Sequence, residues 1–215
     1  MQKTHHIPQL SRRHFLKGSI ITAASTVALS QRGLAAPSER INAAIIGLGV
    51  RGKRLAKQAV EVNGVNITWL VDPDISRANV MKELAPNAKT AQDLREALDD
   101  PDVDVVIIAT CNHWHCLAAI WACQAGKDVY VEKPLGHNVA EQQRLIEISE
   151  ATNRIIQVGT QQRSDHVQEE IRQFLHEEKG LGEIQYIRSN RYGVRPPVPK
   201  IPNSLKIPDS VDYDL

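Results

Sequence analysis

The chain has 215 residues, of which 42% are hydrophobic and 24% are charged. This length and composition are ordinary for a soluble globular protein with one large domain, or one domain and part of another. The formal net charge of +1 is uneven: residues 1–36 hold five bases and no acid, and the remaining 21 bases and 25 acids give a net charge of −4. A mildly acidic body argues against nucleic-acid binding.

The N-terminal residues 1–36 read as a twin-arginine signal peptide. Arg12 and Arg13 precede Phe15-Leu16-Lys17 and a modestly apolar run over residues 18–30, and Ala35-Ala36 is a candidate cleavage site. The run is too short for a transmembrane helix, which needs roughly 20 apolar residues. We therefore expect export through the twin-arginine machinery and a periplasmic or exported location; the alternative is a disordered basic tail.

The stretch from Gly47 to Gly52 reads Gly-Leu-Gly-Val-Arg-Gly and follows an apolar strand predicted over residues 41–46. A helix is predicted over residues 53–60. A strand, a G-x-G-x-x-G loop and a helix in this order are typical of dinucleotide binding. The first glycine permits the turn, the second lets the backbone approach a pyrophosphate, and the third lets the helix pack closely on the strand.

A second predicted strand, over residues 65–71, ends at Asp72. This acid lies 20 positions after Gly52, where a carboxylate can accept from a ribose hydroxyl of the adenosine. A carboxylate would repel a 2′-phosphate, so Asp72 favours NAD over NADP. The alternative is a glycine-rich turn without a ligand, followed by an ordinary Asp-Pro-Asp turn.

Strands and helices continue to alternate up to Thr160. Thr90 is expected to cap one helix with Asp93 reaching back, and Asn138 another with Glu141 at the capping-box position. The alternation predicts an α/β fold, a Rossmann doubly wound parallel sheet over residues 37–160, with ligands beyond the carboxyl ends of the strands. The remaining expected strands are 103–109, 128–131 and 154–158, and the remaining helices are 75–84, 90–99, 113–125 and 138–151.

The pattern changes over residues 161–215, which we interpret as the beginning of an α/β substrate domain that is truncated here. An amphipathic helix is expected over residues 164–179, with Val167, Ile171, Phe174 and Leu175 on its apolar face, and a strand over residues 183–192. One helix and one strand cannot bury a core alone. We therefore expect the 215-residue chain to bind nucleotide without turning over a substrate.

The three cysteines, Cys111, Cys116 and Cys123, lie within thirteen positions of one another. An odd, clustered set is a poor disulfide framework, so buried free thiols are expected. With His113 and His115 they match no standard zinc pattern, so no metal site is expected.

The residues from 41 to 215 resemble the Gfo/Idh/MocA oxidoreductase family. The resemblance is carried by the glycine loop, Asp72, Thr110-Cys111-Asn112-His113-Trp114-His115, Glu132-Lys133-Pro134-Leu135 and Gly159-Thr160-Gln161-Gln162-Arg163-Ser164. Family members carry a Rossmann domain followed by an α/β domain with a large open sheet. Most of them oxidise or reduce a carbon of a sugar, cyclitol or related compound with NAD(P). Cys111 departs from the family pattern, in which proline is usual.

The resemblance implies a catalytic role for Lys133 at the cofactor–substrate junction, as a general acid or base or by polarising the substrate oxygen. A cis bond is expected before Pro134. His113 and His115 could face the substrate, or be helix-start residues with satisfied ring nitrogens; we nominate His115 as a second catalytic residue. Gln161 is expected near the nicotinamide or in a polar hinge. The expected cofactor-binding residues are Gly47, Leu48, Gly49, Val50, Arg51, Gly52, Asp72, Thr110, Asn112, His115, Glu132, Lys133 and Gln161.

These observations predict an NAD-dependent oxidoreductase of carbohydrate metabolism that transfers a hydride at a sugar, cyclitol or polyol hydroxyl. The alternatives are an NAD-using glycosidase or lyase of the same fold with no net redox change, and a truncated nucleotide-binding product. The expected partners are a small carbohydrate or polyol and the export machinery, with no nucleic acid and with a homo-oligomer as an option for the full-length protein.

Overall fold

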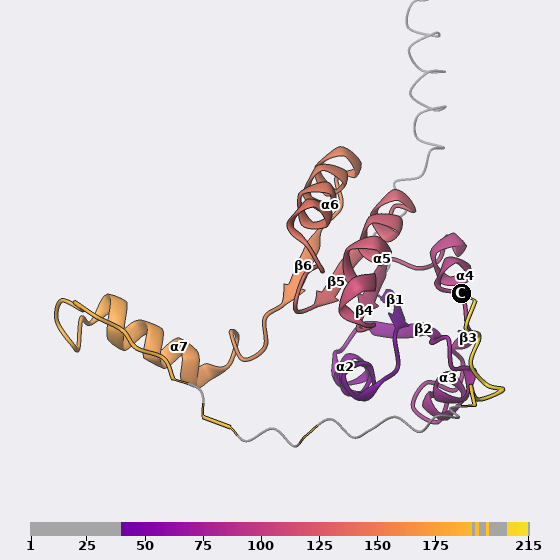
Figure 1. The fold of residues 1–215 in the computed structure, drawn as a ribbon, viewed down its shortest axis with the longest axis horizontal. Coiled ribbons are helices and arrows are strands. Elements are labelled where there is room, and N and C mark those ends of the chain that lie inside the picture. Colours follow the sequence, from indigo (N-terminus) through magenta and orange to yellow (C-terminus); the bar gives the residue numbers. More distant parts are fainter. Residues whose placement is uncertain (1–39, 191, 194–196, 198–205, 215) are drawn as a thin grey trace, which may run out of the picture. The chain divides into compact units, whose positions relative to one another are not determined.

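The computed structural model describes residues 40–190, 192–193, 197 and 206–214 (Figure 1). The predicted signal peptide over residues 1–36 lies outside these described residues. Within them, no helix is both long enough and apolar enough to cross a membrane.

Six parallel strands form one sheet in the order β3-β2-β1-β4-β5-β6. Every neighbouring pair in this order is parallel, and the helices provide the crossovers between them. This is the doubly wound α/β sheet that the alternating pattern predicted, and the fold class is confirmed. The strands are β1 (Ile41–Ile46), β2 (Val65–Val71), β3 (Lys89–Ala91), β4 (Val105–Ile108), β5 (Asp128–Glu132) and β6 (Ile156–Gly159).

The two faces of the sheet carry separate hydrophobic clusters, because successive side chains of a strand point to opposite faces. In β1, Ala44 and Ile46 belong to a cluster with side chains from α4, α5 and α6, whereas Ile45 belongs to a cluster with α2 and α3. Helices therefore cover both faces. They are α2 (Val50–Glu61), α3 (Ile75–Met81), α4 (Leu94–Asp99), α5 (Asn112–Gln124) and α6 (Val139–Thr152).

The predicted caps have mixed outcomes. Asn138 caps α6 as predicted, since its Oδ1 accepts a hydrogen bond of 3.0 Å from the backbone N–H of Glu141. The prediction that Thr90 caps a helix is wrong: Thr90 lies inside β3, and Asp93 caps α4 by accepting from Arg95. Without β3, the edge of β2 would have unpaired backbone groups, so even three extended residues gain ladder hydrogen bonds by pairing there, and side-chain periodicity does not reveal this.

The residues after Thr160 also depart from expectation. The expected helix over residues 164–179 is a shorter α7 (His166–Arg172) that continues as a π-helical turn (Gln173–Glu177), and neither has a buried residue. The strand expected over residues 183–192 is wrong for the described part, because residues 183–190 form no strand. A single segment of strand-forming residues cannot make a ladder without a partner, and none of the described residues pairs with it.

Candidate functional site

The candidate site lies at the carboxyl edge of the sheet, where the loops after the strands meet. Because all the strands are parallel, loops that are far apart in the sequence share this edge. On one side of the sheet the chain passes from β1 to β2 and β3, and on the other side from β4 to β5 and β6. The boundary between β1 and β4 is therefore a topological switch point. Doubly wound sheets bind their ligands in the crevice at such a point.

The glycine loop adopts the shape that a dinucleotide requires. Gly47 has a φ of 85°, and a Cβ there would lie 2.7 Å from the backbone nitrogen of Thr110. A Cβ on Gly52 would overlap the carbonyl oxygen of Gly47. At Gly49 the Cβ position has no atom within 4 Å, so open space adjoins the N-terminus of α2, which begins at Val50. Free N–H groups, a positive dipole end and room for the ligand together fit a pyrophosphate.

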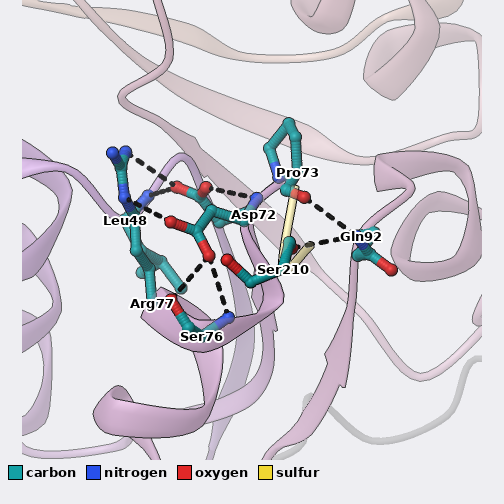
Figure 2. A network of polar contacts seen from close by, with 8 residues as sticks. Leu48, Asp72, Pro73, Ser76, Arg77, Gln92 and Ser210 are labelled. Atoms are coloured by element: carbon teal, nitrogen blue, oxygen red, sulfur yellow. Dashed lines mark hydrogen bonds and ion pairs between the residues drawn. The ribbon is translucent and has the colours of Figure 1, made fainter. Parts of the chain in front are cut away.

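Asp72 holds this loop in place (Figure 2). Its carboxylate is buried, with Oδ2 accepting a hydrogen bond of 2.7 Å from the backbone N–H of Leu48 and Oδ1 one of 2.9 Å from Asp74. The guanidinium of Arg77 lies 3.9 Å from Asp72 and 3.4 Å from the Asp74 carboxylate. A carboxylate has about four acceptor positions, so two remain for ribose hydroxyls.

A cavity of about 780 Å³ opens beside the loop and Asp72. This volume is within the usual range for small-molecule and cofactor sites, which is about 300 to 1,000 Å³. Its walls come from the ends of β1, β2 and β4, the starts of α2, α4 and α5, and the last described residues of the chain. Among the predicted cofactor residues, those that line it are Gly47, Gly49, Val50, Arg51, Asp72 and Thr110.

The segment after β4 supplies the opposite side of the cavity. His113 and Trp114 line it together with Trp121, which lies about two turns further along the same face of α5. The indole rings of Trp114 and Trp121 pack edge to face, with their centroids 5.9 Å apart. Cys111 occupies the N-cap of α5 and makes no side-chain cap bond, and Asn112 is the first residue of the helix. Cys111 is therefore exposed at the edge of the sheet, which corrects the expectation of three buried thiols; Cys116 and Cys123 are buried and free.

His115 and Cys116 fasten α5 to the loop after β5. The fully buried His115 ring places Nδ1 2.6 Å from the carbonyl oxygen of Pro134 and Nε2 3.1 Å from that of Thr110. The Cys116 thiol donates to the carbonyl of Leu135 at 3.2 Å, and burial, with a contribution from Glu141, raises the pKa of this thiol to about 11. The thiol therefore stays a donor at neutral pH. A neutral imidazole has one N–H, so it can donate to one of these two carbonyl oxygens at a time. The buried position of the His115 ring is that of a helix-start residue, and its nomination as a catalytic residue stays a prediction.

The loop after β5 carries the predicted catalytic lysine. The peptide bond between Lys133 and Pro134 is cis, as predicted, and the Lys133 side chain is exposed. Beside it, the buried carboxylate of Glu132 receives the guanidinium of Arg51, with both Nε and a terminal nitrogen 2.6 Å from Oε1. This ion pair joins the glycine loop to the lysine loop, and an Arg–carboxylate contact of this kind fixes their relative position.

The structure thus brings most of the predicted site residues to one edge of the sheet. Gln161 lies there too, exposed in the turn after β6 with a positive φ of 21°. Among the wall residues that sequence reasoning missed are Arg77, Gln92, Trp121, Val211 and Asp214. Arg77 had a usable signal, because a base one turn into the helix after Asp72 points back toward that strand end. Nothing in the sequence pattern indicated that residues 211–214 return to β2.

Similarity to known proteins agrees with this geometry. The family described as "Oxidoreductase family, NAD-binding Rossmann fold" (Gfo/Idh/MocA) matches residues 41–160. An inositol 2-dehydrogenase of Salmonella typhimurium is 35% identical over 128 residues, which are 58% of this chain and 38% of that protein. An alpha-N-acetylgalactosaminidase of Shewanella oneidensis is 32% identical over 86% of this chain and 48% of its own length. The crystal structure of myo-inositol 2-dehydrogenase from Lactobacillus plantarum superposes with a TM-score of 0.64 and 26% identity, covering 67% of this chain and 43% of that one.

The parallel sheet, the glycine loop and the acid at the end of β2 define a dinucleotide-binding α/β protein. More particularly, the chain belongs to the Gfo/Idh/MocA oxidoreductase family with an NAD-binding Rossmann fold. It spans less than half of the length of each of these relatives.

Proposed function

We propose that this chain is the nucleotide-binding part of an NAD-dependent oxidoreductase that acts on a hydroxyl of a sugar, cyclitol or related polyol. Bound NAD would accept the hydride from the substrate carbon. The observation that carries the proposal is that three features lie along one edge of the sheet. They are the open space at Gly49 beside the N-terminus of α2, the Asp72 carboxylate and the Lys133 loop. The inositol dehydrogenases among its relatives support a polyol as the substrate class.

Each residue of the site has a distinct part in this proposal. The N-terminus of α2 binds the pyrophosphate, and Asp72 binds the adenosine ribose and disfavours a 2′-phosphate. Arg51 and Glu132 position the lysine loop on the glycine loop. Lys133 exchanges a proton with the substrate hydroxyl or polarises its oxygen. Because Lys133 is exposed in the described chain, the 215 residues alone bind nucleotide without excluding water from the reacting atoms.

The role of Lys133 is tested by substitution in a longer version of the protein that turns over a polyol. Lys133→Ala should lower turnover by roughly 10²–10⁴-fold, the usual range for a positioned acid–base group. Lys133→Arg should lose nearly as much if proton exchange is the role, since arginine keeps the charge and does not deprotonate. NAD affinity should change little in both. NADH absorbance measures the rate and calorimetry the affinity.

The matched control is Lys82→Ala, which removes an exposed lysine at the end of α3. Turnover of Lys133→Ala at the unmutated rate would remove Lys133 from the mechanism.

A second candidate function is an NAD-using glycosidase with no net redox change. It is favoured by the Shewanella alpha-N-acetylgalactosaminidase, whose match extends over 86% of this chain. Release of the leaving group from an aryl N-acetylgalactosaminide without NADH formation would establish this function in place of the first. Net NADH from a polyol would establish the dehydrogenase.

We further propose that the protein is exported in its folded state by the twin-arginine pathway. The support is the order of Arg12-Arg13, the apolar run and Ala35-Ala36 in the sequence. Export of a folded protein suits an enzyme that loads a nucleotide inside the cell.

A further inference from the structure

A short segment near the end of the chain, residues 208–214, is hydrogen-bonded to the loop that follows β2 (Figure 2). The backbone N–H of Ile75 donates to the carbonyl of Ser210 at 3.0 Å, and that of Asp212 donates to the carbonyl of Pro73 at 3.0 Å. Between these bonds Asp74 and Val211 form an antiparallel bridge. The segment therefore pairs with the residues immediately after Asp72.

Side chains from both partners reinforce this pairing. The amide of Gln92 donates to the carbonyl of Pro73 at 2.9 Å and lies 3.4 Å from that of Ser210. The Asp74 carboxylate has a lowered pKa because the hydroxyl of Ser76 and, next in size, that of Ser210 donate to it. The docked segment is thus fixed by the residues that surround the predicted ribose site.

The same segment forms part of the cavity wall. Val211 and Asp214 line the cavity that Gly49 and Asp72 also line. A dinucleotide whose pyrophosphate lies at α2 and whose ribose meets Asp72 would place its adenosine on the side of the cavity nearest to β2. This is the side to which residues 208–214 are attached, so the half-buried Val211 supplies an apolar surface beside the adenosine.

We propose that residues 208–214 form the outer wall of the adenosine half of the nucleotide site, and that their docking on Pro73–Ile75 is coupled to adenosine binding. The proposal rests on the proposed function in one respect, namely that the cavity takes an adenine dinucleotide. A ligand that contacts this wall binds more tightly when the segment is docked. By linkage, the ligand then shifts the segment toward its docked position.

Two matched variants of the 215-residue chain separate docking from other effects. Asp212→Pro removes the N–H that donates to Pro73. Asp209→Pro makes the same change of residue and charge three positions earlier. Within the described residues, the backbone N–H of Asp209 makes no hydrogen bond that proline would remove. Asp209 is also the second residue of the turn that the Val211 N–H closes on the Pro208 carbonyl, and proline is favoured at that position. Thermal unfolding of both should match that of the unmutated chain, because neither residue belongs to the core.

Calorimetric titrations with ADP, NAD and nicotinamide mononucleotide test the coupling. Asp212→Pro should weaken ADP and NAD binding by about tenfold, the effect of losing one net hydrogen bond and its associated contacts. Nicotinamide mononucleotide should bind equally to both variants, because it lacks the adenosine. A general loss of fold would weaken all three ligands and lower the unfolding temperature.

Limited trypsin digestion gives a second readout of docking. Lys206 is exposed just before the segment, so cleavage after it releases residues 207–215. ADP should slow this cleavage in the unmutated chain and in Asp209→Pro, and should leave it unchanged in Asp212→Pro. Mass spectrometry of the released peptide measures the rate.

The outcomes that overturn the proposal are distinct from those that overturn the proposed function. Equal ADP affinity of Asp212→Pro and Asp209→Pro, with no protection of Lys206 by ADP, would refute the coupling alone. If the unmutated chain binds neither NAD nor ADP, the cofactor assignment fails and the coupling fails with it.

Discussion

At the scale of single residues, Asp72 does more than the sequence indicated. Its position after β2 predicted a ribose acceptor, and the structure adds two structural bonds, from the N–H groups of Leu48 and Asp74. The carboxylate therefore shapes the glycine loop before any ligand arrives. Such second partners are set by the tertiary fold and leave no pattern in the sequence around Asp72.

This double role makes cofactor choice testable at one position. Asp72→Asn removes the charge and keeps one acceptor oxygen, so it retains one of the two bonds from the Leu48 and Asp74 N–H groups. Asp72→Ser also opens space for a 2′-phosphate. We expect NAD affinity to fall by about 1.5–3 kcal/mol, the contribution of a charge-assisted hydrogen bond, while NADP loses less, so the preference for NAD narrows. Calorimetric titration with NAD and with NADP measures the difference in their binding free energies.

Asp99→Asn is the control, because it removes an exposed carboxylate at the end of α4 that does not line the cavity. NADP binding as tightly as NAD to the unmutated chain would contradict the assignment of Asp72.

At the scale of elements, the sequence was most informative where local and global signals agree. The first two strands begin and end as predicted, since the apolar runs are bounded by charged or glycine residues. Predictions failed where an element depends on a partner that periodicity cannot reveal. Thr90 joins β3 only because the edge of β2 is available, and residues 183–190 remain irregular because no described strand pairs with them.

The candidate site shows the same division. Gly47, Asp72 and Lys133 could be named from motifs, because their chemistry is tied to fixed places in a βα unit. The Arg51–Glu132 ion pair could not, because it joins a residue of α2 to the last residue of β5, 81 positions apart. Its existence depends on the register of the sheet rather than on either motif.

The glycine loop allows one prediction that separates folding from binding. A methyl group at Gly52 would overlap the Gly47 carbonyl, so Gly52→Ala should lower the free energy of unfolding by about 1–3 kcal/mol, as overpacking does. A methyl group at Gly49 meets no protein atom, so Gly49→Ala should change stability by less than about 1 kcal/mol. It should nevertheless weaken NAD binding at least about tenfold, because the methyl group takes the space of the pyrophosphate.

Urea unfolding and calorimetric titration of the two variants measure these effects, and each variant serves as the other's control. Unchanged NAD affinity in Gly49→Ala would show that the pyrophosphate does not lie at the N-terminus of α2.

At the scale of the whole molecule, the described residues divide into two parts. The sheet with its helices up to α6 has a packed core, whereas the residues after Thr160 have apolar side chains that no other described element buries. Val167, Ile171 and Phe174 are each 44–45% exposed, although their spacing is that of an apolar helix face. The hydrophobic clusters draw their residues from the sheet and the helices up to α6. The cooperative unit of folding is therefore expected to be the dinucleotide-binding part.

The proposed export concerns the molecule as a whole, because the twin-arginine pathway carries folded proteins. Replacing Arg12 and Arg13 together by lysine should leave the protein in the cytoplasm with residues 1–36 uncleaved, since under this proposal the export receptor recognises the arginine pair. Fractionation and immunoblotting follow the location and size of the protein. Arg32→Lys, in the same segment but outside the pair, should be exported normally.

Mature protein outside the inner membrane in the doubly substituted strain would show that another route carries it.

The bond between Leu48 and Asp72 also limits how this protein can diverge. A protein that evolved to use a nucleotide with a 2′-phosphate would have to lose the Asp72 carboxylate, because that carboxylate would repel the phosphate. The same carboxylate holds the glycine loop in the shape that binding of either nucleotide requires. A single substitution of Asp72 would weaken binding of both nucleotides and narrow the preference for NAD without giving tight binding of the new ligand. The change of preference therefore requires a prior mutation that anchors the loop by other means, and the order in which such mutations accumulate is constrained by one backbone hydrogen bond.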